Sequence, residues 1–149
     1  MKKDKMLGLA ISIASMAHVE QFDKGGKPYI LHPLEVMRMV KSKESEVLQA
    51  AVLHDVLEDT DISLEILRDA GFSERVIAAL DCLTHRDGEV YADYILRICD
   101  NRDAMLVKMA DLKHNSDITR LKGVSEKDLL RMKKYHTAYI LTKKRLKAL

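Results

Sequence analysis

The sequence predicts an all-α protein, a single domain over residues 1–149 built as a bundle of about seven helices. Leu, Met, Ala, Lys and Glu are frequent, and the 149 residues include only two prolines, a composition that favours helices. Apolar residues recur at spacings of three and four, which is the helical pattern. With 47% hydrophobic and 32% charged residues, the chain is long enough to bury one core.

Gly, Pro and polar residues divide this pattern into helical segments. The segments are expected at residues 4–22, 33–42, 44–59, 63–70, 73–84, 91–99, 103–117 and 125–148. The apolar stripe of the first segment ends at His18, which we interpret as a core residue behind the functional site. Pro33 is typical of the first position of a helix and makes His32 an N-cap, although Ser, Thr, Asp or Asn would be usual there. Gly71 ends the short fourth segment. In the last segment, the residues predicted to face inward are Leu129, Met132, His136 and Tyr139.

Composition and charge exclude several classes of protein. No apolar run approaches the roughly 18 residues of a membrane span, and the amino terminus lacks the features of a signal peptide. Cys82 and Cys99 are isolated in the sequence, as expected for reduced thiols of a cytoplasmic protein. Residues 120–149 contain ten Lys and Arg and two acids, but the net charge is only +2 and Trp is absent, which argues against a nucleic-acid partner. The oligomeric state is left open.

The heptad HDVLEDT places an imidazole and three carboxylates at the end of an apolar helix. At 100° per residue, His54, Asp55, Glu58 and Asp59 fall within an arc of about 140°. Asp55 continues the inner stripe of its helix, where an uncompensated carboxylate is costly, and it repels Asp59 one turn on. A divalent cation would cancel this repulsion, and His and Asp are suitable ligands for one. The alternative is a solvated helix end whose histidine is capped by a carbonyl.

A second helix repeats this pattern. Asp111 occupies a position that the apolar periodicity of residues 103–117 reserves for the core, and Asn115 shares its face one turn later. A buried Asp can instead accept backbone N–H groups or form an ion pair. Two helices that each place an Asp in the inner stripe, with His32 and His54 available, favour a metal site.

Between the first two helices lies a loop with the sequence DKGGKPY. Its lysines, Lys24 and Lys27, flank a Gly pair. Glycines let an anion approach the backbone, while the ammonium groups neutralise it, so the loop would suit a phosphate-bearing substrate. Many surface turns have the same composition, which is the alternative interpretation.

The order His32, His54-Asp55 and Asp111 resembles that of the HD superfamily of metal-dependent phosphohydrolases. Several stretches are similar, more narrowly, to the hydrolase domain of the Rel/Spo alarmone hydrolases and to their small stand-alone relatives. The similarity covers roughly residues 5–120. The stretches that carry it are Ala17-His18 with Gln21, residues 24–33 (KGGKPYILHP), residues 50–60 (AAVLHDVLEDT), Leu83-Thr84 and residues 107–115 (VKMADLKHN).

This resemblance implies a helical HD domain that binds one divalent metal ion, with Mn²⁺ as the expected ion. The implied ligands are His32, His54, Asp55 and Asp111. Glu58 and Asp59 would handle the attacking water. The family removes the 3′-pyrophosphate from guanosine tetra- or pentaphosphate, so the implied partner is a small phosphorylated nucleotide. The implied substrate contacts are Lys24, Asn115, Arg131 and Tyr135. Because the two histidines would bind metal as neutral imidazoles, activity should fall below about pH 6.

The chain departs from the family at positions that surround the substrate. The departures are Asp23 for the first residue of a basic pair, Leu112 for an Arg, Asp117-Ile118 for Arg-Thr, and His85 for a Lys. Arg86, which follows His85, is taken as a substitute contact. Two alternatives therefore stay in view: an HD hydrolase that acts on another nucleotide or phosphorylated metabolite, and a metal-bearing regulatory module without turnover. Retention of both Glu58 and Asp59 argues against the module.

Overall fold

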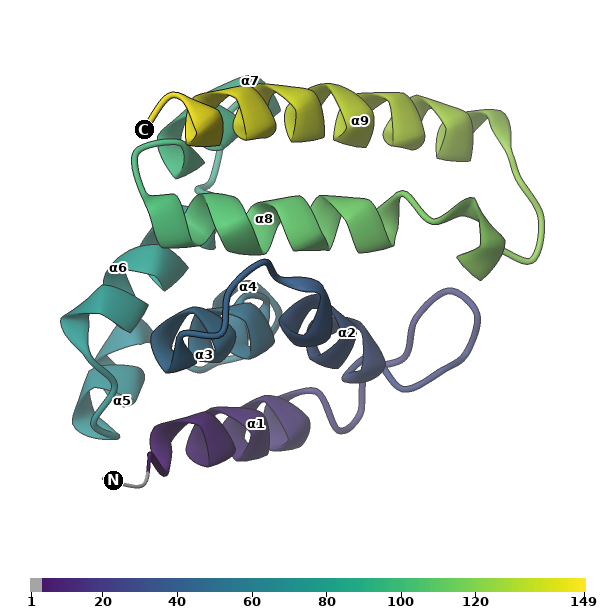
Figure 1. Cartoon of the computed structure of the whole chain (residues 1–149). Helices are drawn as coiled ribbons and strands as arrows, with labels where there is room; N and C mark the ends of the chain where they lie inside the picture. Colours follow the sequence, from purple (N-terminus) through teal and green to yellow (C-terminus); the bar gives the residue numbers. More distant parts are fainter. Residues whose placement is uncertain (1–3) are drawn as a thin grey trace.

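The computed structural model describes residues 4–149 and confirms the all-α architecture (Figure 1). Within this range there are nine α-helices, because the helix expected over residues 44–59 is divided into two. They are α1 (Met6–Ala17), α2 (Leu31–Met39), α3 (Ser45–Leu53), α4 (Val56–Asp59), α5 (Leu64–Asp69), α6 (Glu74–Leu83), α7 (Tyr91–Ile98), α8 (Arg102–Asn115) and α9 (Glu126–Lys147). A 3₁₀ helix, η1 (Ile118–Arg120), precedes α9, and an isolated antiparallel bridge pairs Phe22 with Pro28.

The helices are stacked in layers around one core. In Figure 1, α1 lies at the bottom, α2 and α3 above it, then α8, with α7 and α9 at the top, while α5 and α6 close one end. Both α2 and α3 pack against α8, and α9 lies along the opposite side of α8. The largest fully buried side chains include Leu53, Leu67, Ile77, Leu80, Ile95, Ile98, Met105 and Leu112. This arrangement brings α2, the end of α3 and the middle of α8 together inside the molecule.

Polar caps fix where several helices begin. Ser63, Ser73 and Asn101 accept hydrogen bonds from backbone N–H groups in the first turns of α5, α6 and α8, which satisfies donors that have no partner inside the helix. Ser125 and Asp128 form a reciprocal capping box at the start of α9. Gly71 follows α5 with φ +102°, a conformation that ends a helix and favours glycine.

The expected N-cap role of His32 is wrong. Helix α2 begins at Leu31 with Ile30 as its N-cap, so His32 is the second helical residue and Pro33 the third. Proline is tolerated throughout the first turn because the N–H groups there have no intrahelical acceptor. The imidazole of His32 is thereby carried on a helix that packs against α8, and it is buried.

The long third helix expected over residues 44–59 is broken in two. Helix α3 ends at Leu53, His54 and Asp55 form a turn, and α4 begins at Val56. The first helix is also shorter than expected, because it ends at Ala17 with His18 as its C-cap. Apolar periodicity continues through both places, so the pattern alone did not mark the breaks.

The face that α9 turns inward is rotated from the one expected. Ala138 and Thr142 are buried, whereas Leu129 is 48% exposed and His136 is also exposed. Near its start, α9 buries the carboxylate of Asp128, which caps the helix and pairs with Arg131. Tyr139, as predicted, packs against the core, and so do Leu141 and Leu146. The orientation of α9 is thus set by these residues together with the cap and the buried Ala138 and Thr142.

Two further predictions concern membrane spans and the two cysteine thiols. Among the described residues, none of the helices combines the length and the apolar character that crossing a bilayer requires. Cys82 and Cys99 are both free and half-buried. Burial raises the pKa of each thiol, which disfavours the thiolate and makes both side chains poor nucleophiles.

Candidate metal centre and active site

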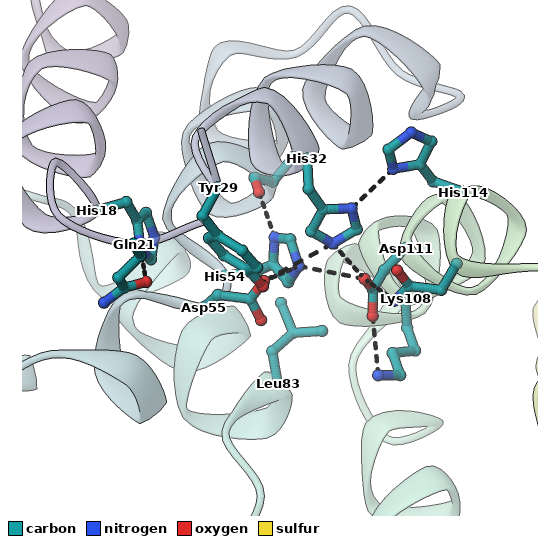
Figure 2. A network of polar contacts seen from close by, with 12 residues as sticks. His18, Gln21, Tyr29, His32, His54, Asp55, Leu83, Lys108, Asp111 and His114 are labelled. Atoms are coloured by element: carbon teal, nitrogen blue, oxygen red, sulfur yellow. Dashed lines mark hydrogen bonds and ion pairs between the residues drawn. The ribbon is translucent and has the colours of Figure 1, made fainter. Parts of the chain in front are cut away.

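Four side chains from three elements converge beneath the surface (Figure 2). They are His32 from α2, His54 and Asp55 from the turn between α3 and α4, and Asp111 from α8. Asp111 Oδ1 lies 2.9 Å from His32 Nε2 and 3.3 Å from His54 Nε2. Asp55 Oδ2 lies 3.0 Å from His54 Nε2 and 3.7 Å from His32 Nε2. The structure thus brings together all four residues that the sequence predicts as ligands.

The orientation of His54 suits a cation. Its Nδ1 lies 2.6 Å from the carbonyl oxygen of Ala51 and donates to it, so Nε2 carries the lone pair when the ring is neutral. Nε2 is buried and has no hydrogen-bond partner, yet it faces oxygens of Asp55 and Asp111. A lone pair directed at two carboxylates is unfavourable unless a proton or a metal ion lies between them.

A neighbouring histidine orients His32 in the same way. His32 Nδ1 lies 2.7 Å from His114 Nδ1, and the two rings are stacked. Burial, followed by the charge of Arg120, lowers the pKa of His114 to about 4, so this ring is neutral at pH 7. When His32 donates from Nδ1 to His114, its Nε2 lone pair is directed at Asp111, as ligation requires.

Each aspartate is held by a further side chain. The Tyr29 hydroxyl donates to Asp55 Oδ2 at 2.6 Å, and the Lys108 ammonium donates to Asp111 Oδ2 at 2.9 Å. Asn115 also donates to Asp111, at 3.0 Å. Lys108 contacts Oδ2 of Asp111, whereas Asn115 contacts Oδ1, the oxygen that faces the two histidines. Together these contacts fix the orientation of the carboxylates.

The charges of the cluster shift its pKa values strongly. Burial by itself would raise the pKa of the Asp111 carboxyl, but the charges of Lys108 and His54 hold it well below its usual value. Burial by itself would lower the pKa of His54, but Asp55 and Asp111 raise it well above 6.5. Without metal, a proton on His54 therefore occupies the space between the two carboxylates.

The two acids predicted to be catalytic lie at the exposed edge of the cluster. Glu58 and Asp59 are the last two residues of α4, one turn after the ligand Asp55, and both are exposed. Glu58 accepts a hydrogen bond from the backbone N–H of His85. Burial, followed by the charges of Asp55 and Glu58, raises the pKa of Asp59. Both carboxylates are thus open to solvent one helical turn from Asp55.

His18 and Gln21 connect the end of α1 to this edge. His18 is buried, as predicted, and its Nδ1 lies 2.8 Å from Gln21 Oε1. Gln21 Nε2 donates to the backbone carbonyl of Asp59 at 2.9 Å. The pair therefore holds the carboxyl end of α4 in place.

A cavity of about 330 Å³ opens beside His32 and contains most of the predicted substrate contacts. Lys24, Asn115, Arg131 and Tyr135 all line it. The rest of its lining comes from the loop before α2, from the segment around η1 and from α9, namely Phe22, Asp23, Gly25, Tyr29, Asp117, Arg120, Leu121 and Met132.

A second cavity of about 270 Å³ lies over the metal-ligating carboxylates. Asp55, Glu58 and Asp111 form its acidic side. Tyr29, Asn115 and Tyr135 line both cavities. The remaining residues of the second cavity are His85, Tyr91, Tyr94, Lys108, Leu112 and Lys134.

Two predicted contacts lie apart from both cavities. Lys27 is exposed, and its backbone N–H donates to Asp23 Oδ1 at 2.9 Å, which closes the Gly turn. Arg86 is exposed and pairs with Asp81 at 3.3 Å. The structure does not bring Lys27 or Arg86 to the cluster, so their roles stay predictions.

Sequence reasoning missed residues that hold the ligands. The sequence marks Tyr29 only as part of a loop, Lys108 only as part of a family-like stretch, and His114 as a member of that stretch and of the inner stripe of its helix, without a role in holding a ligand. Lys108 and His114 are three residues before and after Asp111, a spacing that places all three on neighbouring positions of a helix. That spacing was a usable signal, whereas the contact of Tyr29 with Asp55 spans 26 positions and depends on the path of the loop.

Comparisons with known proteins find relatives of this chain by sequence and by structure. The chain matches no protein-family model. It is 36% identical over 116 residues to a guanosine-3′,5′-bis(diphosphate) 3′-pyrophosphohydrolase of Vibrio cholerae, a match that covers 69% of this chain and 16% of that protein. The corresponding protein of Aquifex aeolicus is 34% identical over 116 residues, covering 71% and 16%. The bifunctional (p)ppGpp synthase/hydrolase SpoT of Escherichia coli K12 is 34% identical over 123 residues, covering 74% and 18%.

A solved structure supports the fold at nearly full length. A metazoan ortholog of SpoT that hydrolyses ppGpp superposes with a TM-score of 0.75 at 22% identity, covering 98% of this chain and 88% of that chain. By contrast, the chain spans less than a fifth of the curated relatives named above.

The helical fold and the cluster of His and Asp side chains define an HD-type domain. The sequence matches assign the chain to the family of the Rel/Spo alarmone hydrolases, as an HD-type segment related to part of those longer proteins. This confirms the family and the fold that the sequence predicts.

Proposed function

We propose that the chain is a metal-dependent phosphohydrolase that removes the 3′-pyrophosphate from ppGpp. Its metal ion, with Mn²⁺ as the expected species, is bound by His32, His54, Asp55 and Asp111. The observation that carries the proposal is the buried Nε2 of His54, which has no hydrogen-bond partner and faces two carboxylates. Two imidazoles and two carboxylates at one point are suitable ligands for a divalent transition metal.

The side chains around the metal position have distinct roles. When bound, the ion supplies a Lewis acid that polarises a phosphoryl oxygen and acidifies a water molecule. Glu58 and Asp59 orient the attacking water and accept its proton, because their carboxylates lie one helical turn from Asp55 and are exposed. Tyr29, Lys108 and His114 hold the ligands in orientation.

The two cavities are consistent with a nucleotide that carries phosphates on two sides. The larger cavity, lined by Lys24, Asn115, Arg131 and Tyr135, binds the nucleoside and its 5′-phosphates. The smaller cavity, over Asp55, Glu58 and Asp111, receives the pyrophosphate that is cleaved. The relatives are named for hydrolysis of guanosine-3′,5′-bis(diphosphate), which has this arrangement of phosphates. We propose that the reaction takes place in the cytoplasm, because isolated, reduced cysteines are typical of cytoplasmic proteins.

One observation favours a second candidate substrate class. Asp23 and Asp117, two of the departures from the family, both line the larger cavity. Carboxylates at these positions change which nucleobase the cavity binds and how many phosphate charges it tolerates. The second candidate is therefore an HD hydrolase with the same mechanism that acts on a different nucleotide or phosphorylated metabolite.

The deciding experiment measures pyrophosphate and orthophosphate release. Metal-free protein is reconstituted with Mn²⁺ and tested on ppGpp and on a panel of nucleotides, with Asp59→Asn as the inactive control. Pyrophosphate release from ppGpp that is lost in Asp59→Asn supports the first function. Turnover confined to other nucleotides supports the second. Metal binding without any turnover would overturn both and leave a regulatory module.

A further inference from the structure

The smaller cavity contains a cation that the roles assigned above do not use. Lys134, on α9, lines this cavity together with Asp55 and Asp111. Its Nζ lies 4.4 Å from the centroid of the Tyr91 ring and 5.5 Å from that of Tyr135. Lys134 is an exposed residue, and contacts of its ammonium group with two aromatic faces favour a position at the cavity wall.

The charge of Lys134 is not neutralised by the protein. Lys134 takes part in none of the ion pairs found within residues 4–149. Lys108, the other lysine of the same cavity, is committed to Asp111 at 2.9 Å. Lys134 is thus the lysine of this cavity that has a charge left for a ligand.

An independent observation points to the same place. The hydroxyl of Tyr91 is buried and has no hydrogen-bond partner, although Tyr91 lines the cavity. A buried hydroxyl without a partner is costly, and a ligand oxygen could accept a hydrogen bond from it. Burial also raises the pKa of Tyr91, so the group stays a neutral hydrogen-bond donor.

We propose that Lys134 and Tyr91 form an anion subsite that binds the pyrophosphate group of the substrate beside the metal ligands. The inference rests on the proposed function, in that it assigns this group to the smaller cavity. A volume of about 270 Å³ is below that of pockets for drug-sized ligands and suits a small anion. A metal ion held by Asp55 and Asp111 and the ammonium of Lys134, which lines the same cavity, would both neutralise the anion.

The test measures binding and needs no turnover. Methylenediphosphonate, a pyrophosphate analogue that is not hydrolysed, is titrated calorimetrically into the Mn²⁺-loaded protein. Lys134→Met keeps the apolar stem and removes the charge, and should weaken binding by about tenfold or more. Lys134→Arg should retain most of the affinity. Tyr91→Phe removes only the hydroxyl and should weaken binding by about two- to tenfold.

Lys133 provides the matched control. It is the adjacent residue on the same helix. Like Lys134, it is exposed and lines an apolar groove between α7 and α9, but it does not line the smaller cavity. Lys133→Met changes the net charge by the same amount as Lys134→Met, so it should leave the affinity within about twofold. Equal losses in the two variants would mean a general charge effect and would overturn the subsite.

Unchanged affinity of the Lys134→Met variant for the analogue would also overturn the anion subsite. Measuring analogue binding and hydrolysis separately distinguishes this proposal from the proposed function. If the protein hydrolyses no nucleotide but binds the analogue in a Lys134-dependent way, the subsite stands and the hydrolase assignment falls. If ppGpp is hydrolysed and Lys134→Met binds the analogue normally, the assignment stands and the subsite falls.

Discussion

At the scale of single residues, the proposed function assigns the buried groups of the cluster to the metal and the exposed groups to water. His54 and Asp111 are buried, whereas Glu58 and Asp59 are exposed on α4. Burial protects the ligands from solvent and makes their orientation part of the core. Exposure leaves the two acids free to exchange protons with water. Substitutions in the two groups should therefore have different consequences.

The exposed acids should be required for hydrolysis but not for metal binding. Asp59→Asn and Glu58→Gln keep the shape of each side chain and remove its basicity, so hydrolysis should fall by about 10²- to 10⁴-fold. Metal content, measured on the purified variants, should stay unchanged. Asp61→Asn alters a nearby exposed acid and should retain activity. Loss of bound metal in Asp59→Asn with full activity would contradict the assignment.

Metal binding should release a proton from His54. Asp55 and Asp111 raise the pKa of this imidazole well above 6.5, in spite of its burial. The folded metal-free protein therefore holds a proton that the unfolded chain loses near pH 6.5. Its stabilising effect is complete below about pH 6.5 and is lost as pH rises through the folded pKa. A metal ion displaces this proton, so metal affinity should rise with pH.

Calorimetry of Mn²⁺ binding at pH 7, in two buffers of different ionisation enthalpy, measures this release. We expect about one proton per ion bound. The variant His136→Ala removes an exposed imidazole of α9 and should release the same number. Binding that is independent of both buffer and pH would show that His54 is already neutral in the metal-free protein.

At the scale of helices, two glycines should respond to the same substitution in opposite directions. Gly8 lies on the exposed side of α1, and a Cβ there would meet no atom within 4 Å. Gly8→Ala should stabilise the protein by about 0.5–1 kcal/mol, because Ala favours helix. Gly71 has φ +102°, so Gly71→Ala should destabilise it by about 1–2 kcal/mol. Urea unfolding measures both, and equal signs would contradict this account.

Several helices could be predicted from the sequence within a residue or two. Helices α5, α6 and α8 begin next to Ser63, Ser73 and Asn101, whose side chains cap them, and a cap is a local signal. The break at His54 and Asp55 could not be predicted in this way, because the apolar period continues through it. There, the packing of α3 against α2 and α8 overrides the local pattern.

The candidate site was predictable where it depends on residue type in a periodic pattern. An Asp within the apolar stripe of a helix is a signal in the sequence, and it marks Asp55 and Asp111 as candidate ligands. The contacts of Tyr29 and Lys134 depend on the path of a loop and on the rotation of α9 about its axis. Neither is encoded in a local pattern. The prediction of the inward face of α9 is confirmed for Tyr139 and wrong for Leu129 and His136.

At the scale of the whole molecule, the proposed ligands join two helical layers, one formed by α2 and α3 and the other by α8 (Figure 1). His32 comes from α2, Asp55 from the turn after α3, and Asp111 from α8. An ion bound among them stabilises the folded state by mass action, since the unfolded chain lacks the site. Free Mn²⁺ at a hundred times its dissociation constant contributes about 2.7 kcal/mol.

Removal of the ion should therefore lower the melting temperature of the protein. For a chain of 149 residues, about 2.7 kcal/mol corresponds to roughly 5–10 °C. Thermal unfolding with excess Mn²⁺ and with excess chelator measures the difference. Asp111→Asn should abolish the difference, because it removes a ligand charge. A melting temperature that is insensitive to chelator in the unaltered protein would contradict a metal site in the core.

The distance along the chain between ligands has a consequence for biosynthesis. His32 and Asp111 are 79 positions apart, and Asp111 lies on a helix that emerges from the ribosome after α1 to α7. Translation proceeds from the amino terminus, so His32, His54 and Asp55 are exposed to the cell before their last partner exists. Under the proposed function, high-affinity metal capture would wait for α8 to dock, so metal uptake would report that α2, α3 and α8 have come together in the nascent chain.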